Sequence, residues 1–202
     1  KIFDKKFKTN VKNNSNNINF KLLNSGINID INFDENQKET ITSGTFKSRI
    51  LNTNLKFNFF NDDKIIKIYN SYFRSKNLSF QNEIFITLNP FLDINSKINI
   101  DEINSQIFKV INFNKIIKSK HFIKKINSKN EINFKPKKVH KYLVDEASLD
   151  IELIYGRLIY TKKFSISESL FECFGDVNFL EDYPILSFNC SVLSKNKQKL
   201  FK

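Results

Sequence analysis

The chain has 202 residues, with 33 Lys and Arg against 21 Asp and Glu, a formal net charge of +12, and 40% hydrophobic residues. With only 4 glycines, a glycine-cradled phosphate site is disfavoured. The only arginines are Arg49, Arg74 and Arg157. Because specific phosphate and base recognition usually uses the planar fork of Arg, nucleic acid is not an expected partner. The excess of Lys, Asn, Ile and Phe, whose codons are AT-rich, indicates an AT-rich genome.

Four regions follow one another along the chain. Residues 1–17 are rich in Lys and Asn and are predicted to be a loop or lead-in, 18–100 a β-meander, 101–141 a helical insert with a basic linker, and 142–202 a C-terminal β-meander. Because the chain begins at Lys1 and contains no Met, we expect it to be an internal or processed piece of a larger, repeat-like β domain. No stretch approaches the ~20 apolar residues that span a bilayer.

A period of two dominates residues 18–100. Apolar and polar residues alternate strictly over Ile27–Phe33, so one face of that strand is apolar and the other is polar. We predict a hairpin over 18–33 that turns at 24–26, and a meander with turns at 52–54 and 61–63. The further strands expected here are Thr45–Leu51, Leu55–Phe60, Ile65–Tyr72, Leu78–Leu88 and Phe91–Ile100.

The alternation is lost between Asp101 and Asn127, where apolar residues take helical spacing. We predict two short helices near residues 103–127, the second capped by Asn114. The basic stretch Lys115–Lys125 has two interpretations, a contact with anionic lipid headgroups or a solvated helix face. Ser128–Lys141 is predicted to be a basic linker.

The C-terminal block returns to alternation. Ser148–Tyr160 is predicted to be a strand with a bulge at Gly156-Arg157. Two segments, Phe171–Leu180 and Ile185–Leu193, are expected to pair as a hairpin, which places Cys173 almost opposite Cys190. Two interpretations of these cysteines remain open, small buried hydrophobes or a cross-strand disulfide in an oxidising compartment.

Catalytic chemistry is not indicated. His121 and His140 each lie among lysines without a partner set, and the chain has no nucleophile elbow, phosphate loop or zinc-protease helix. Asp150 and Glu152 are placed on the polar side of a strand by the alternation alone. We therefore expect no enzyme activity, no cofactor and no metal site.

The closing residues resemble a known family. The run Ile151–Tyr160 (IELIYGRLIY), followed by Cys173–Phe179 (CFGDVNF), is similar to the C-terminal region of AsmA-like proteins. The order upstream also fits, because a strand block ends at Leu88–Ile94 (LNPFLDI), a helical segment follows, and strands then resume. The resemblance extends from about Phe46 to Ser194.

This resemblance implies a mainly β fold, an antiparallel meander in a curled or sandwich-like sheet, in the periplasm of a bacterial cell envelope. The full-length protein would be anchored in the inner membrane by an N-terminal helix. Phospholipid would be its partner, carried in an apolar β-groove for lipid transport or outer-membrane assembly, without catalytic residues. The residues expected to face lipid are Ile151, Leu153, Phe171, Val177, Leu186 and Phe188.

Two other functions remain open beside this one. The same apolar residues would equally form the core of an ordinary sandwich, which would make the chain a structural or adhesive envelope protein. A basic nucleic-acid binder would need Lys and aromatic residues clustered on one exposed face.

Overall fold

The computed structural model describes residues 6–11, 16–23, 26–35, 40–104, 125–135, 144–166 and 168–194. These residues form a single sheet of 13 strands and contain no helix. The strands are β1 (Phe7–Val11), β2 (Asn17–Leu22), β3 (Ile27–Phe33), β4 (Thr42–Ile50), β5 (Thr53–Asn61), β6 (Ile65–Arg74), β7 (Leu78–Thr87), β8 (Asp93–Ile103), β9 (Asn127–Phe134), β10 (Glu146–Ile154), β11 (Arg157–Ile166), β12 (Ser169–Asn178) and β13 (Leu186–Ser194).

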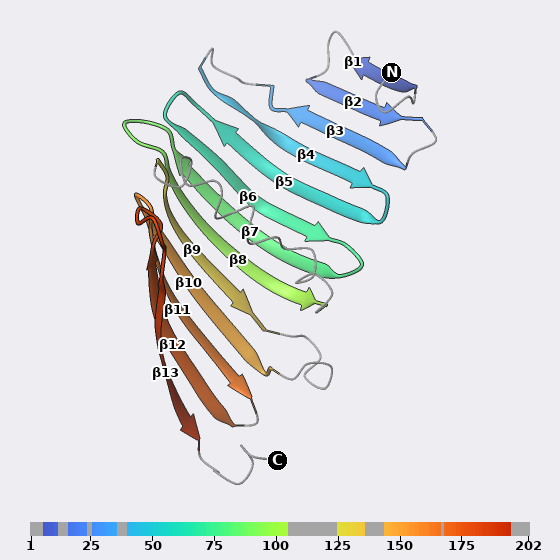
Figure 1. The fold of residues 1–202 in the computed structure, drawn as a ribbon. Coiled ribbons are helices and arrows are strands. Elements are labelled where there is room, and N and C mark those ends of the chain that lie inside the picture. The colour runs from blue at the N-terminus through green and yellow to red at the C-terminus, as the bar shows by residue number, and fades with distance from the viewer. Residues whose placement is uncertain are drawn as a thin grey trace.

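The strands lie side by side in chain order (Figure 1). Every neighbouring pair is antiparallel except β8 and β9, which are parallel. An antiparallel pair needs only a short turn, whereas a parallel pair needs a crossover connection. The connection between β8 and β9 therefore divides the meander into two blocks, β1–β8 and β9–β13.

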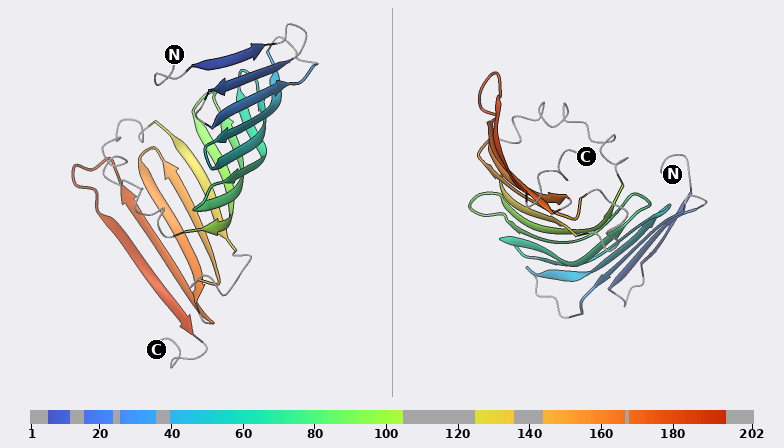
Figure 2. Two further views of the ribbon diagram at one scale, coloured as in Figure 1. Left: turned by 90° about the vertical axis from the view of Figure 1, so that its right-hand side faces the viewer. Right: turned by 90° about the horizontal axis from the view of Figure 1, so that it is seen from below.

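The antiparallel β-meander predicted from the alternation is confirmed, but its shape differs from the prediction. Figure 2 shows one open, twisted layer with β1 and β13 at its two edges. The sheet is neither closed nor strongly curled, and the described residues contain no second sheet to make a sandwich. Alternation fixes which side chains share a face, but a curled sheet, a sandwich and an open sheet all require the same alternation.

The expected lead-in loop contains a strand. Phe7–Val11 forms β1 and pairs with β2, with Phe7 opposite Leu22 and Val11 opposite Ile18. Phe7, Thr9 and Val11 follow the same alternation as the later strands, over a segment too short to stand out among the surrounding Lys and Asn residues.

Strands enter the regions predicted to be a helical insert and a basic linker. Ile103 ends β8, and β9 occupies the first half of the region assigned to the linker. The period of two in β9 was hidden because its apolar-side positions begin with Ser128 and Asn130 before Ile132 and Phe134. Residues 105–124, which carry the core of the predicted helices and Asn114, lie outside the described residues.

The bulge predicted at Gly156-Arg157 is wrong, because the chain reverses there. Ile154 pairs with Arg157, so Tyr155 and Gly156 form a two-residue turn between β10 and β11. Both residues have positive φ, 44° and 96°, as a type I′ hairpin turn requires. A single alternating run thus contains two strands.

Few side chains are buried. Among the described residues the buried apolar side chains are Leu22, Ile126 and Val177, and no large side chain is fully buried. When two sheets pack face to face, they lie about 10 Å apart, and the side chains between them are buried. The apolar face of this sheet is only partly covered by protein.

Candidate functional site

The strand register gathers most of the apolar residues of the 13 strands on one side of the sheet, here called the apolar face, although Tyr69, Phe85 and Phe174 lie on the other side. Directly opposite residues in a ladder project to the same side, so the face can be followed from strand to strand. In the N-terminal block, for example, Ile18 lies opposite Ile31, Ile31 opposite Phe46, and Phe46 opposite Phe57. The other side, here called the polar face, carries Lys, Asn, Asp and Glu.

All six residues predicted to face lipid lie on the apolar face. Leu153, Val177 and Leu186 belong to one row across the strands, which Leu158 completes. Two further rows on this face contain the other three predicted residues. These rows are Ile151–Tyr160–Gly175–Phe188 and Ala147–Phe164–Phe171–Val192. The sequence pattern therefore identified one physical surface.

The six residues differ in how much of each is accessible. Val177 is 8% exposed and functions as a packing residue, whereas Leu186 and Phe188 on the edge strand β13 are 53% and 66% exposed. Ile151, Leu153 and Phe171 are intermediate. A ligand on this face would therefore contact the β13 residues most extensively.

Gly175 makes room for an aromatic ring on the apolar face. A Cβ atom at this position would lie 2.7 Å from Cε1 and Cζ of Tyr160 and 2.7 Å from the carbonyl oxygen of Ser187. The Tyr160 ring thus lies flat across the backbone of β12. Two rows along, the rings of Phe164 and Phe171 stack with centroids 4.7 Å apart. Lys162 lies on this face opposite Leu149 and Cys173, with its Nζ 4.8 Å from the centroid of the Phe164 ring.

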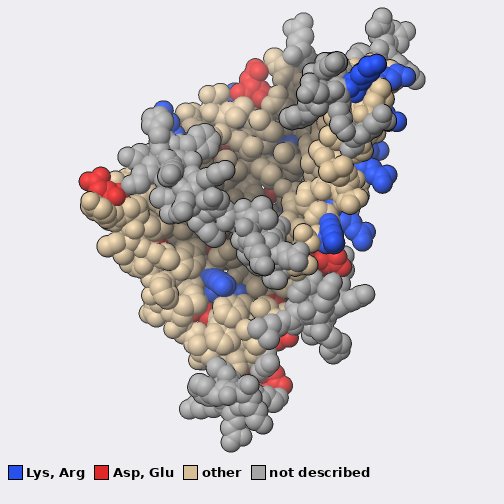
Figure 3. Space-filling model, turned by 45° about the vertical axis from the view of Figure 1, so that its right-hand side comes forward, with Lys and Arg blue, Asp and Glu red and all other residues tan. Residues whose placement is uncertain are grey.

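The sequence prediction missed the N-terminal half of the apolar face. Here Phe46 stacks on Phe57, with ring centroids 4.8 Å apart, and Phe73 stacks on Phe80 at 4.8 Å. The strict alternation of Ile27–Phe33 could have identified this half as part of the same surface. In Figure 3 the described part of the hollowed side of the sheet is mainly uncharged, with some Lys or Arg and Asp or Glu atoms among the others.

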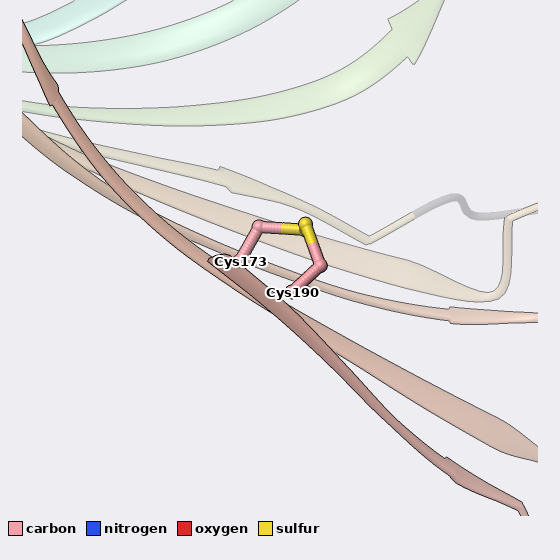
Figure 4. The surroundings of a disulfide bond; sticks show 2 residues. All are labelled: Cys173 and Cys190. Atoms are coloured by element: carbon pink, nitrogen blue, oxygen red, sulfur yellow. A yellow bond between two sulfur atoms is a disulfide. The ribbon is translucent and has the colours of Figure 1, made fainter. Parts of the chain in front are cut away.

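A disulfide bond joins Cys173 and Cys190 on the apolar face, in the row between Gly175–Phe188 and Phe171–Val192 (Figure 4). The S–S distance is 2.08 Å, and the two residues are direct cross-strand partners in β12 and β13. Of the two interpretations open from the sequence, the structure has the bonded one. The bond ties the exposed edge strand to the rest of the sheet.

Ion pairs organise the polar face of strands β8–β12. Lys163 Nζ lies 2.9 Å from Glu172 Oε1, and Lys129 Nζ lies 3.1 Å from Glu152 Oε1. In each pair the hydrogen bond to the glutamate raises the pKa of the lysine. Two further pairs join Arg157 to Asp176 and Lys97 to Glu131. All four pairs are solvent-exposed, and such pairs contribute little to stability.

The two acidic residues considered for catalysis, Asp150 and Glu152, lie on the polar face among these ion pairs. Glu152 binds Lys129, and Asp150 lies one row further along β10, opposite Glu131 and Thr161. Among the described residues no group of His, Cys, Asp or Glu has a metal-binding arrangement. His121, His140 and nearly all of Lys115–Lys125 lie outside the described residues.

No protein-family model, curated protein or solved structure matches the chain. In the part of the chain that the structure describes, no helix has the length and apolar character required to cross a bilayer.

Proposed function

We propose that this chain is a non-enzymatic, AsmA-like module whose apolar face binds the acyl chains of phospholipids, in lipid transport or outer-membrane assembly. The observation that carries the proposal is the combination of a continuous apolar face with a single layer of protein. An ordinary domain covers such a face with a second layer, and the described residues provide none.

The energetics favour acyl chains as the occupant. Each methylene group removed from water contributes ~0.8 kcal/mol, so a few methylenes against Phe188 and Leu186 would offset the exposure of these side chains. The surface is mainly aromatic and aliphatic, with Lys162 and the hydrogen-bonded residues Ser96 and Asn130 among its polar members. A surface of this kind suits flexible chains of variable length more than a ligand that must be hydrogen-bonded.

The compartment is part of the proposal. The Cys173–Cys190 bond is compatible with an oxidising environment, and the periplasm is one. In the AsmA-like arrangement an N-terminal helix would hold the protein to the inner membrane, while the sheet receives phospholipid.

Native mass spectrometry of the purified protein, followed by extraction and identification of lipid, tests this function. We expect co-purified phospholipid, and we expect Leu153→Asp to release it. The matched control is Ile154→Asp, which places the same charge one residue away on the polar face, where Ile154 is 47% exposed. Loss of lipid in the first variant and retention in the second would support the apolar face as the binding surface.

A second variant keeps the test decisive if Leu153→Asp fails to fold. Phe188 is 66% exposed on the edge strand, so Phe188→Asp should fold whatever covers the rest of the face. A folded wild-type protein without lipid would overturn the proposal and favour a structural or adhesive envelope protein.

A further inference from the structure

One end of the N-terminal block carries a row of unpaired cations on its polar face. Six residues on β1–β6 are successive cross-strand partners and form one row, here called the basic row. They are Lys8, Lys21, Asn28, Arg49, Asn54 and Arg74. The row contains four cations and no acid, and all four cations are exposed. With strands ~4.8 Å apart, the four charges fall within roughly 25 Å.

The placement of these charges opposes folding. Lys8 lies directly opposite Lys21, and in the next polar-face row Lys47 lies directly opposite Lys56, with Asp30 on the other side of Lys47. Like charges in opposite positions destabilise a sheet. None of these four lysines has an ion pair to a described residue, whereas the polar-face cations of β8–β12 are all paired. The basic row is thus a region of uncompensated positive potential.

Exposed aliphatic residues stand at the same end of the sheet, in the turns that follow β2 and β4. The residues, here called the apolar tip, are Leu23, Ile50 and Leu51. They are 39%, 43% and 66% exposed. The two turns touch, because the Leu51 amide donates to the Gly26 carbonyl at 3.0 Å. Cations beside aliphatic side chains match the boundary between headgroups and acyl chains of a bilayer.

Leu51 has a backbone conformation that is unfavourable for a residue with a side chain. It is the first residue of a two-residue hairpin loop, between the paired Ile50 and Thr53, and its φ is +54°. Glycine is preferred at such a position because a side chain disfavours positive φ. A large apolar side chain that has a positive φ and is 66% exposed gains little from burial in the fold, which points to a role outside the folded chain.

We infer that this end of the sheet docks on an anionic phospholipid bilayer, with the apolar tip entering the interface and the basic row binding phosphate groups. Figure 3 shows Lys and Arg gathered along the right-hand edge of the molecule, over the N-terminal strands. A bilayer fits better than nucleic acid, because the tip is aliphatic and nucleic-acid surfaces interleave cations with aromatic side chains on which bases stack. This inference is independent of acyl-chain binding on the apolar face.

Co-sedimentation with vesicles tests the docking surface. We expect binding to vesicles of equal parts phosphatidylcholine and phosphatidylglycerol, and little binding to phosphatidylcholine alone. Because each cation near an anionic surface contributes about a fivefold factor in affinity, Arg49→Gln with Arg74→Gln should weaken binding about twenty-five-fold. The control, Lys97→Gln with Lys129→Gln, removes the same net charge from the ion-paired strands β8 and β9 and should leave binding within about twofold.

Replacement of Leu51 separates docking from folding. Leu51→Gly removes the side chain and suits the positive φ, so the protein should fold at least as well while vesicle affinity falls about tenfold. The control is Tyr155→Gly, which removes an exposed side chain from another positive-φ turn residue and should not change affinity. Both variants should keep any co-purified lipid, so a failure of docking is distinct from a failure of acyl-chain binding.

Three results would overturn the inference: no binding to anionic vesicles, equal binding to both vesicle types, or full binding by the double arginine variant. Salt-sensitive binding of single-stranded RNA without vesicle binding would identify the basic row as a nucleic-acid surface instead.

Discussion

The polar face differs between the two halves of the sheet, although both are built from the same residue types. In β8–β12 each Lys or Arg on this face lies beside an acid, as with Lys163 and Glu172. In β1–β6 most polar-face cations lie opposite Asn or another cation, as with Lys8 and Lys21, and only Lys47 lies opposite an acid, Asp30. Codon bias would account for the number of lysines but not for this division, so position is more informative than net charge.

The covalent cross-link is the largest expected difference between the halves. The Cys173–Cys190 bond closes a loop with a sequence separation of 17, and a loop of that size corresponds to about 3 kcal/mol of chain entropy. We therefore expect Cys173→Ser with Cys190→Ser to lower the free energy of unfolding by about 3 kcal/mol. Denaturant titration checks the value, and hydrogen exchange should show the loss in β12 and β13 while β1–β4 keep their protection.

In the N-terminal half, where the described residues contain no disulfide, the backbones of β3 and β4 approach closely at Gly44. A Cβ atom on Gly44 would lie 2.1 Å from the carbonyl oxygen of Asn32 on β3. Because that atom belongs to the backbone, the strands must separate, and we expect Gly44→Ala to cost about 2 kcal/mol of the free energy of unfolding. Ser43→Ala, on the opposite face of the same strand, is the control for a general weakening of β4. An unchanged denaturation midpoint for Gly44→Ala would show that β3 and β4 do not approach so closely.

Charge reversal should act with opposite sign in the two halves. Lys56→Glu places an acid opposite Lys47 and should stabilise the protein by about 0.5 kcal/mol, whereas Lys97→Glu places an acid opposite Glu131 and should destabilise it by about the same amount. Thermal melts in low salt measure both, and both effects should shrink in high salt. Effects of the same sign would mean that net charge, and not pairing, governs the polar face.

The smallest expected effect concerns pH. The pKa of Asp62, in the turn after β5, is lowered from its ordinary 3.8 because the amides of Lys64 and Ile65 donate to its carboxylate at 2.8 and 2.7 Å. Its contribution is present above pH 3.8 and is lost as the pH falls through the lowered value. The raised lysine pKa of Lys129 and Lys163 gives a contribution present below 10.5 that is lost at still higher pH.

Acid should therefore weaken the N-terminal half slightly and alkali the C-terminal half. Melting curves followed by far-UV circular dichroism at both extremes of pH check this expectation. In Asp62→Asn the acid-side difference should vanish, and in Lys163→Gln the alkaline-side difference should diminish.

Alternation predicted the sheet and the membership of its apolar face, because side-chain direction in a strand follows from the backbone alone. It did not predict the single open layer, which depends on what packs against the face. The alternation also merged β10 with β11 into one predicted strand, because Tyr155 continues a run of apolar residues. The two strands are separated by a turn in which Tyr155 and Gly156 both have positive φ. The basic row was not predictable either, because Lys21 and Arg49 become neighbours through Asn28, by a register that local sequence does not reveal.

The parallel pairing of β8 with β9 has a consequence for how the chain folds. Within β1–β8 and within β9–β13 each strand pairs with its neighbour in sequence across a connection that reverses the chain, so each block can assemble from local hairpins. The β8–β9 ladder is the exception, because the whole connection from Asn104 to Ile126 must be ordered or looped out before its first hydrogen bond forms. The entropy of closing this loop is lost before the non-local contacts between the blocks form. We therefore expect the two hairpin arrays to form first and the joining of the two blocks to be the slow step in folding.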